Sequence, residues 1–439
     1  MFSAQSPSEF IVEEILPDGT VLEVGKRYGP KQAEGNGHGV NEVHAESVVE
    51  MGAPEDQAME RDYFTHFVLQ KTDWNTMQAL DALAFQMHVK PGRFNFAGTK
   101  DKNAVTVQRC SAFAMAPSRI LPAKIKDIVI LGAWKAKDKV KLGHLAGNRF
   151  TITLTEANCG KVVTAESLQA KAESMGFKMK NLFGRQRFGS LRQNTAKVGA
   201  KMLSGDFEGA AWEYIAGEGP EPESFAQARA KLREEKDFAS AKIYFPGPLK
   251  YEKTMLAHLA DHPSDFVGAL RKLPPNLQLM LVHAYQSQLF NEFIAENGGD
   301  YSCPADALGF PETEKAGLKN AGTEKTELGN GGKKVAGEEN GSGSMGEIRW
   351  PCCHIIGYDT AMSESEASFL ERKGVKPELF KVKSMPNLSV KGTFRATHAP
   401  LKDFSAEDKT LEDGSKAAVV RFSLPSGSYA TVALDQLLG

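Results

Sequence analysis

The stretch "AGTKDK" places Asp101 at a glycine turn between two strand-like runs, with Lys100 and Lys102 on either side. A carboxylate in such a place can act as a nucleophile or a general base when a neighbouring cation keeps it ionised. Aspartate is also an ordinary turn residue, because its side chain bonds the nearby backbone. A chemical role for Asp101 therefore depends on what else converges on this turn.

Three further glycine-containing stretches mix aromatic, amide and basic side chains. They are "GNRF" (Asn148 and Phe150), "NLFGRQRFG" (Arg185, Arg187 and Phe188) and "LPSGSYAT" (Tyr429). Aromatic faces stack on bases and arginines pair with phosphates, so this mixture is typical of nucleotide binding. Taken singly, each stretch also fits a structural role: a solvated basic face, a strand core, or a tyrosine buried beside a turn.

Other chemistries of a glycine turn are excluded by spacing. Gly98, Thr99 and Lys100 do not follow the GxxxxGK[ST] pattern of a P-loop. No G-x-S-x-G stretch could carry a serine nucleophile. No HExxH or Cys/His cluster marks a metal site, and "PCCH" at residues 351–354 has no second ligand pair nearby.

Composition is compatible with nucleic acid binding although the chain as a whole is nearly neutral. The 439 residues are 41% hydrophobic, enough for two domains, and carry a formal net charge of -2. Residues 178–201 include seven basic residues and no carboxylate, whereas residues 34–62 are strongly acidic. Local basic surface is what phosphate binding needs, so we expect the basic run to contact a nucleic acid backbone.

The cysteines and the chain start indicate an intracellular protein, in the cytoplasm or the nucleus. Five cysteines without a CxxC pair are too few for a disulfide framework, so we expect reduced thiols. No apolar run approaches the length of about 18 residues that a membrane helix needs. The opening "MFSAQSPSEF" lacks the pattern of a secretory signal.

Periodicity predicts which elements position these stretches. Strands are expected over 9–16, 20–24, 63–71, 93–98, 104–110 and 143–155, and helices over 73–89 (capped by Asn75 or Thr76), 163–175, 224–237 and 276–296. Residues 178–381 look mainly helical, and the chain ends with a strand, a turn and a short helix. Residues 29–57 predict a mobile loop, and the low-complexity residues 312–347 a disordered insertion.

The chain resembles the TruD family of pseudouridine synthases. The stretches "AGTKDKNAVTVQ", "GNRF", "NLFGRQRFG", "LVHAYQSQLFN" and "FSLPSGSYAT" are similar, in order, to that family's signature segments. "SPSEFIVEE" is similar to its opening segment, so the resemblance runs almost from end to end. "KTDWNT" and "HAYQSQLFN" look more like the eukaryotic and archaeal branch than the bacterial one.

The resemblance implies an α+β fold, in which a mixed-sheet catalytic domain is interrupted by a mainly helical insertion domain. We expect the catalytic domain over residues 1–175 and 393–439, and the insertion domain over residues 176–392. This arrangement would return "LPSGSYAT" to the neighbourhood of Asp101. RNA would then lie in the cleft between the domains.

The resemblance also implies residue roles. The aspartate that matches Asp101 is catalytic, either attacking the sugar C1' or helping to remove a proton from C2'. Phe150 would stack at the target base, Asn148 would hydrogen-bond near it, and Tyr429 would close the other side. The remaining expected contacts are Phe10 in the substrate pocket and Lys100, Arg185, Arg187 and Phe188 on the RNA. No cofactor and no metal are implied.

The implied partner is RNA, most typically tRNA modified at uridine 13, with other small or messenger RNAs as further candidates. The protein is expected to be a monomer and not to bind membranes. A non-catalytic RNA-binding relative with the same fold is the main alternative, and an accidental match on an unrelated scaffold is another. The retained Asp101 favours a synthase.

The N-terminus departs from the pattern of bacterial relatives. They carry a lysine before the phenylalanine that matches Phe10, within reach of the catalytic aspartate, and the aligned residue here is Ala4. Either an N-terminal segment is missing or another cation takes this place. Lys100 and Lys102 are the nearest in sequence, although neighbours on an extended chain often point apart.

Overall fold

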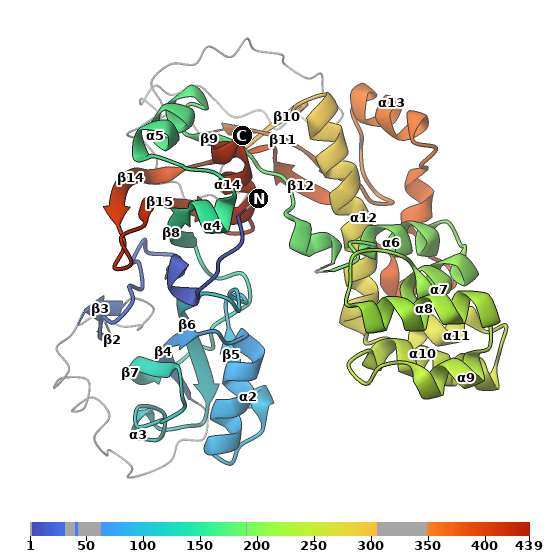
Figure 1. The fold of residues 1–439 in the computed structure, drawn as a ribbon, viewed down its shortest axis with the longest axis horizontal. Coiled ribbons are helices and arrows are strands. Elements are labelled where there is room, and N and C mark those ends of the chain that lie inside the picture. The colour runs from blue at the N-terminus through green and yellow to red at the C-terminus, as the bar shows by residue number, and fades with distance from the viewer. Residues whose placement is uncertain (1, 31–39, 43–62, 190, 305–348) are drawn as a thin grey trace, which may run out of the picture.

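The computed structural model describes residues 2–30, 40–42, 63–189, 191–304 and 349–439. Figure 1 shows a sheet-containing half on the left, to which both termini belong, and a helical half on the right. The helices of the helical half come from the middle of the chain, so the described chain leaves the sheet, builds the helical half and returns.

An eight-stranded sheet forms the centre of the first half. Its strand order is β14-β15-β8-β1-β6-β4-β7, with β5 paired to β6. The strands are β1 (Phe10–Ile15), β4 (Phe64–Thr72), β5 (Phe94–Phe96), β6 (Val105–Phe113), β7 (Ile128–Ala136), β8 (Gly147–Thr155), β14 (Lys402–Thr410) and β15 (Lys416–Pro425). β1 runs parallel to β6 and the other pairs are antiparallel, which confirms a mixed sheet and the α+β class.

Short helices cover this sheet. They are α2 (Thr76–Gln86), α3 (Pro117–Ile120), α4 (Glu156–Cys159), α5 (Ala165–Ser174), α14 (Ala430–Leu438) and the 3-10 turns η1 (Pro7–Glu9) and η2 (Pro91–Arg93). As predicted, α2 begins at Asn75, whose side chain accepts the Met77 amide. Leu80 and Leu83 of α2 pack against Phe67 of β4, so the α2 side of the sheet has its own core.

The helical half has a separate hydrophobic core. It is built by α6 (Thr195–Leu203), α7 (Phe207–Ala216), α8 (Glu223–Glu235), α9 (Phe238–Tyr244), α10 (Lys250–Asp261), α11 (Phe266–Arg271), α12 (Pro275–Glu296), α13 (Glu364–Arg372), η5 (Pro377–Phe380) and η6 (Pro386–Leu388). The long α12 lies against α6. The mainly helical character expected for this stretch is confirmed.

Small sheets join the two halves. β9 (Lys178–Lys180) pairs with β13 (His398–Pro400), so the chain leaves the sheet half and returns to it side by side. β10 (Tyr301–Pro304), β11 (Arg349–Ile355) and β12 (Thr393–Ala396) form a second small sheet. The domain boundaries predicted at residues 175 and 393 remain a proposal.

Two expectations from the sequence need correction, and two strands were missed. Residues 20–24 form no strand, because only Val21 makes a bridge, to Ile15. The long strands β7 and β14 were not anticipated: β7 is an almost continuous apolar run without polar alternation, whereas polar residues dominate β14. Cys303 and Cys352 form a disulfide, because the antiparallel pairing of β10 with β11 brings their Cα atoms to 6.4 Å, whereas Cys110, Cys159 and Cys353 are free and buried.

The two predicted loops fall largely outside the described residues. Within the expected loop 29–57, β2 (Tyr28–Pro30) pairs with β3 (Val40–Glu42), so part of it is ordered as a hairpin. The remainder of that loop and all of residues 312–347 lie outside the described residues. None of the helices in the described ranges is long and apolar enough to cross a membrane.

Candidate active site

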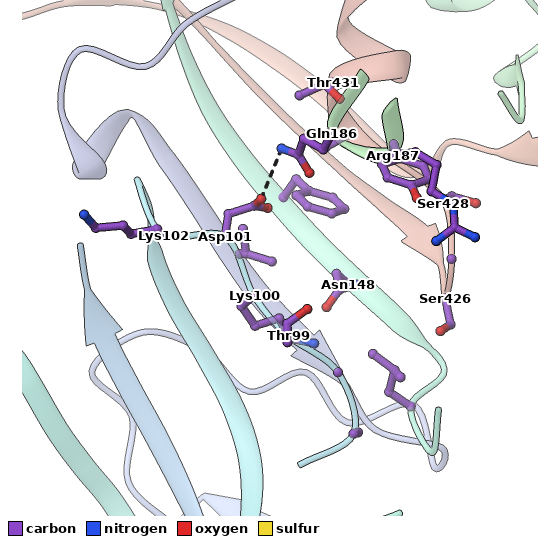
Figure 2. Close-up of a pocket in the computed structure, with 18 of the residues that line it drawn as sticks. Thr99, Lys100, Asp101, Lys102, Asn148, Gln186, Arg187, Ser426, Ser428 and Thr431 are labelled. Atoms are coloured by element: carbon purple, nitrogen blue, oxygen red, sulfur yellow. Dashed lines mark hydrogen bonds between the residues drawn. The ribbon is translucent and has the colours of Figure 1, made fainter. Parts of the chain in front are cut away.

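A cavity of about 710 Å³ lies where the sheet meets the start of the helical half. Its lining comes from segments far apart in the chain, and Figure 2 shows Asp101 facing Gln186 across it. The predicted residues that line it are Asp101, Asn148, Phe150, Tyr429, Phe10, Lys100 and Arg187. Arg185 and Phe188 are not part of this lining.

The turn that carries Asp101 is fixed through its backbone. Gln108 of β6 donates its amide to the carbonyl of Gly98 at 3.1 Å. The amide of Lys100 donates to Thr76 Oγ1 at 3.0 Å, and Thr76 in turn donates to Gln108 Oε1 at 3.0 Å. Thr76 and Gln108 are fully buried, so the turn is held by hydrogen bonds that water does not weaken.

Two buried lysines, Lys100 and Lys71, hold the same turn against the sheet. Lys100 Nζ pairs with Glu14 Oε2 of β1 at 2.8 Å, and the two side chains are 3% and 0% exposed. Lys71 Nζ of β4 donates to the backbone carbonyl of Asp101 at 2.8 Å. The structure thus buries Lys100 beneath the turn at the cavity lining, and its contact with RNA stays a prediction.

Lys71 is the cation that the sequence did not single out. Burial lowers the pKa of Lys71 to about 8, although the negative charge of Asp101 opposes the shift and Lys100 adds to it. Lys102 is exposed and points away from Asp101 (Figure 2). Among the described residues, Lys71 is therefore the lysine that hydrogen-bonds to Asp101, through the backbone carbonyl, and alternation along β4 gave no sign that this side chain is buried.

Phe150 belongs to the core and to the cavity at once. It is 5% exposed and its ring lies 6.0 Å from that of Phe10 and 5.7 Å from that of Phe422. Asn148, two residues earlier on β8, has a buried side-chain oxygen without a hydrogen-bond partner among the described residues. A buried polar atom that lacks a partner is costly, so this oxygen suits a ligand that supplies a donor.

The opposite wall carries Tyr429 and Gln186. The ring of Tyr429 lies so close to Gly184 that a Cβ there would come within 2.9 Å of its Cδ1. Phe183 meets the same ring edge-on at 6.3 Å. Gln186, in the 3-10 turn η3 (Arg185–Phe188), donates to Asp101 Oδ1 at 3.4 Å (Figure 2), a contact that the "NLFGRQRFG" motif gave no reason to expect.

Arg395 of β12 holds this wall together and was also missed. Its guanidinium lies 4.1 Å from the ring centre of Phe183 and donates to the carbonyls of Asn181 and Gly427 at 3.1 and 3.0 Å. Loss of water around it lowers the pKa of Arg395 to about 10. Residue 427 begins the turn that leads to Tyr429, so Arg395 links that turn to the start of the helical half.

The predicted basic run at residues 178–201 does not form one surface. Arg187 lies at the cavity, where its Nε donates to Ser287 at 3.1 Å and burial lowers its pKa. Arg192 is partly buried instead, with its guanidinium nitrogens 3.8 and 3.7 Å from carboxylates of Glu221 and Glu252. Lys201 pairs with Asp206, which caps α7, so the run is divided among different environments. No cluster of three or more His, Cys, Asp or Glu that could hold a metal occurs among the described residues.

The chain is similar to known proteins over nearly its whole length. The family model described as "tRNA pseudouridine synthase D (TruD)" matches residues 4–437. A Methanococcus maripaludis protein named "Probable tRNA pseudouridine synthase D 2" is 32% identical over 440 residues, which cover 99% of this chain and 94% of the relative. A relative from Methanopyrus kandleri, named "Probable tRNA pseudouridine synthase D", is 34% identical over 383 residues, 85% of each chain. The crystal structure of the Methanosarcina mazei protein described as tRNA pseudouridine synthase D superposes with a TM-score of 0.65 at 28% identity, covering 99% of this chain and 92% of that one.

Proposed function

The chain belongs to the TruD family of tRNA pseudouridine synthases, and from that premise we propose that Asp101 is its catalytic group and that its target is a uridine of the position-13 type in tRNA. The observation that carries the proposal is a carboxylate on an anchored turn, at the edge of a cavity with Phe150, Asn148 and Tyr429 in its lining. Such an enzyme works where tRNA is made or used, in the cytoplasm or the nucleus.

The cavity suits a uracil that has left its helix. Phe150 offers an apolar face at one side and Tyr429 a ring at the other, which offsets the stacking lost when a base is flipped out. The unpartnered oxygen of Asn148 accepts a hydrogen bond, and the N3–H of uracil is a donor of the required kind. Pyrimidines without that N–H donor in the same place would leave the Asn148 oxygen buried and unpaired.

The reaction is an isomerisation, so its atoms balance without a cofactor. The C1'–N1 bond breaks, the uracil turns, and C1' rejoins at C5, which gives up its proton while N1 gains one. The Asp101 carboxylate either bonds to C1' while the base is detached or takes a proton from C2'. Both routes need a carboxylate held in one place, and its turn is held because Lys71 donates to the Asp101 carbonyl and Thr76 accepts from the Lys100 amide.

Tritium release tests the proposal. A tRNA transcript labelled with tritium at uracil C5 should lose one label per modified site when incubated with the protein, because only rejoining at C5 displaces that hydrogen. The Asp101→Asn variant serves as the matched control, since its amide is neither nucleophile nor base. If the wild-type protein binds tRNA but releases no tritium, it is an RNA-binding relative and not a synthase.

Mapping identifies the target. Pseudouridine sites in tRNA from cells that lack the protein are compared with those from normal cells. Loss of pseudouridine at position 13 alone is the expected result, and loss at other positions or in other RNAs would correct the substrate.

A further inference from the structure

The loop of residues 137–146 connects β7 to β8 and forms one rim of the candidate active site. Leu142, Gly143 and Leu145 line the cavity directly. This loop is distinct from the basic run at residues 178–201, and none of the contacts proposed above involves it. Its sequence, "KDKVKLGHLA", begins with three lysines at alternate positions, separated by Asp138 and Val140.

The loop is held in one conformation by bonds to the sheet half. The backbone amide of Val140 donates to Ser111 at 2.9 Å, and Val140 itself is 3% exposed. The amide of Gly143 donates to the carbonyl of Ala97, at the start of the Asp101 turn, at 2.7 Å. The amide of Ala146 donates to Ile15 of β1 at 2.9 Å. The loop and the catalytic turn are therefore parts of one rigid unit.

Three lysines project from this loop without counter-charges. Lys137, Lys139 and Lys141 are exposed, and none of them pairs with a carboxylate among the described residues. The one acidic residue among them is Asp138. In contrast to Arg192 and Lys201, these charges are available to a partner, and they lead along the loop to Leu142 and Gly143 at the cavity.

Leu142 adds an apolar contact next to these charges. Its side chain is 80% exposed and lines the cavity, so it offers an apolar surface to a base that lies beside these charges. Single-stranded nucleic acid is typically bound by a row of cations that contact successive phosphates, together with apolar side chains that contact the bases. A protein partner would need complementary carboxylates, whereas a polynucleotide always supplies phosphates.

We propose that residues 137–142 bind the RNA strand adjoining the flipped uridine, with Lys137, Lys139 and Lys141 on consecutive phosphates and Leu142 against the neighbouring base. The inference rests on the proposed function for the identity of the RNA. It adds that the strand enters along the β7–β8 side of the cavity. The rigid link through Gly143 and Ala97 then sets the distance from this strand to Asp101.

The test uses the triple variant Lys137→Gln, Lys139→Gln, Lys141→Gln in the full chain. The dissociation constant for a tRNA transcript should rise at least 10-fold at moderate salt, while turnover at saturating tRNA stays within about 2-fold. The slope of log affinity against log salt should become shallower by about 2, since each lost phosphate contact removes about 0.7 to 0.9. Leu142→Ser should weaken binding a few-fold without changing that slope.

A matched control triple carries the same charge change elsewhere: Lys171→Gln, Lys250→Gln and Lys409→Gln, all exposed and outside the cavity lining. If both triples change affinity and salt slope equally, the effect is general charge and the inference is wrong. If the loop triple binds tRNA like the wild type, it is wrong as well. Binding is read separately from tritium release, so a protein without synthase activity would contradict the proposed function and leave this inference to be decided by the binding data.

Discussion

The two walls of the cavity are built in different ways. On one wall, Asp101 sits on a turn held by buried hydrogen bonds and by the lysines Lys71 and Lys100, all within the sheet half. On the other, Tyr429 and Gln186 lie on loops joined through Arg395 and the ring of Phe183, at the junction with the helical half.

We interpret the first wall as the part that serves the reaction and the second wall as the part that recognises the substrate. Buried, charge-assisted bonds have narrow geometry, so they fix the turn that carries Asp101. Ring contacts and bonds to an exposed backbone turn allow small shifts, so they suit a wall that closes on a substrate. We therefore expect changes in the first wall to alter rate and stability, and changes in the second to alter substrate affinity.

The largest expected effect comes from Asp101 itself. Asp101→Asn and Asp101→Ala should lower the turnover number by about 10³-fold or more, because neither side chain can act as nucleophile or base. The fold should survive, since the anchors of the turn use the Asp101 backbone and not its carboxylate. Tritium release and thermal unfolding measure the two effects. Turnover near the wild-type value in either variant would remove Asp101 from the mechanism.

The next effect concerns the stability of the first wall. Lys100→Met leaves Glu14 buried without its partner and should lower the free energy of unfolding by about 3–5 kcal/mol. Adding Glu14→Gln should restore much of that loss, because the second change removes the unpaired charge. Urea unfolding of both single variants and the double variant gives the coupling energy. Additive losses would mean that the pair is not coupled.

The second wall should respond in affinity. Arg395→Lys keeps a charge but loses the planar contact with Phe183 and the bond to Gly427, so we expect kcat/KM to fall about 10- to 100-fold, mostly through KM. Gly184→Ala should act in the same direction, by pushing the Tyr429 ring into the cavity. Arg271→Lys, an exposed arginine of the helical half, is the control. A pure loss in kcat would contradict the assignment of this wall to recognition.

The smallest effect is a pH dependence from Lys71. Because its pKa in the folded protein is about 8, Lys71 loses its charge as pH rises through that value, and activity should decline a few-fold. The stability of the fold should instead increase over this pH range. Between about pH 8 and the ordinary lysine pKa of 10.5, the unfolded chain binds a proton that the folded chain does not, so the free energy of unfolding rises with pH.

Lys71→Met separates this effect from other titrations in alkaline solution. The variant should lack the decline in activity near pH 8 and the rise in stability above it, whatever its absolute activity. The charged or titratable neighbours of Lys71 are Asp101, Lys100 and Cys110. An unchanged pH profile in Lys71→Met would show that Lys71 does not cause the decline.

The sequence predicted the parts of the site that lie on distinctive motifs. Asp101, Asn148, Phe150 and Tyr429 were expected together and do line one cavity, and the mixed sheet with a helical half was expected as well. Their functional roles stay predictions.

The supporting residues could not be predicted, for physical reasons. Lys71 and Glu14 are charged residues inside strands, where alternation places a polar side chain on the solvent face. Arg395 lies in a stretch with no pattern of its own. The basic run was expected to form one surface, but spacing along the chain does not say which charges a later helix will neutralise. Arg192 meets Glu221 and Glu252 only once the helical half has folded.

The pairing of β15 with β8 has a consequence for how the protein is made. Thr151 and Arg421 are neighbours in the sheet but 270 residues apart in the chain. At typical synthesis rates, the open edge of β8 must wait on the order of tens of seconds for its partner to emerge from the ribosome. An unpaired strand edge invites pairing with other chains. The nascent protein therefore has an aggregation-prone interval, which ends only when its last strand arrives and brings Tyr429 to the cavity.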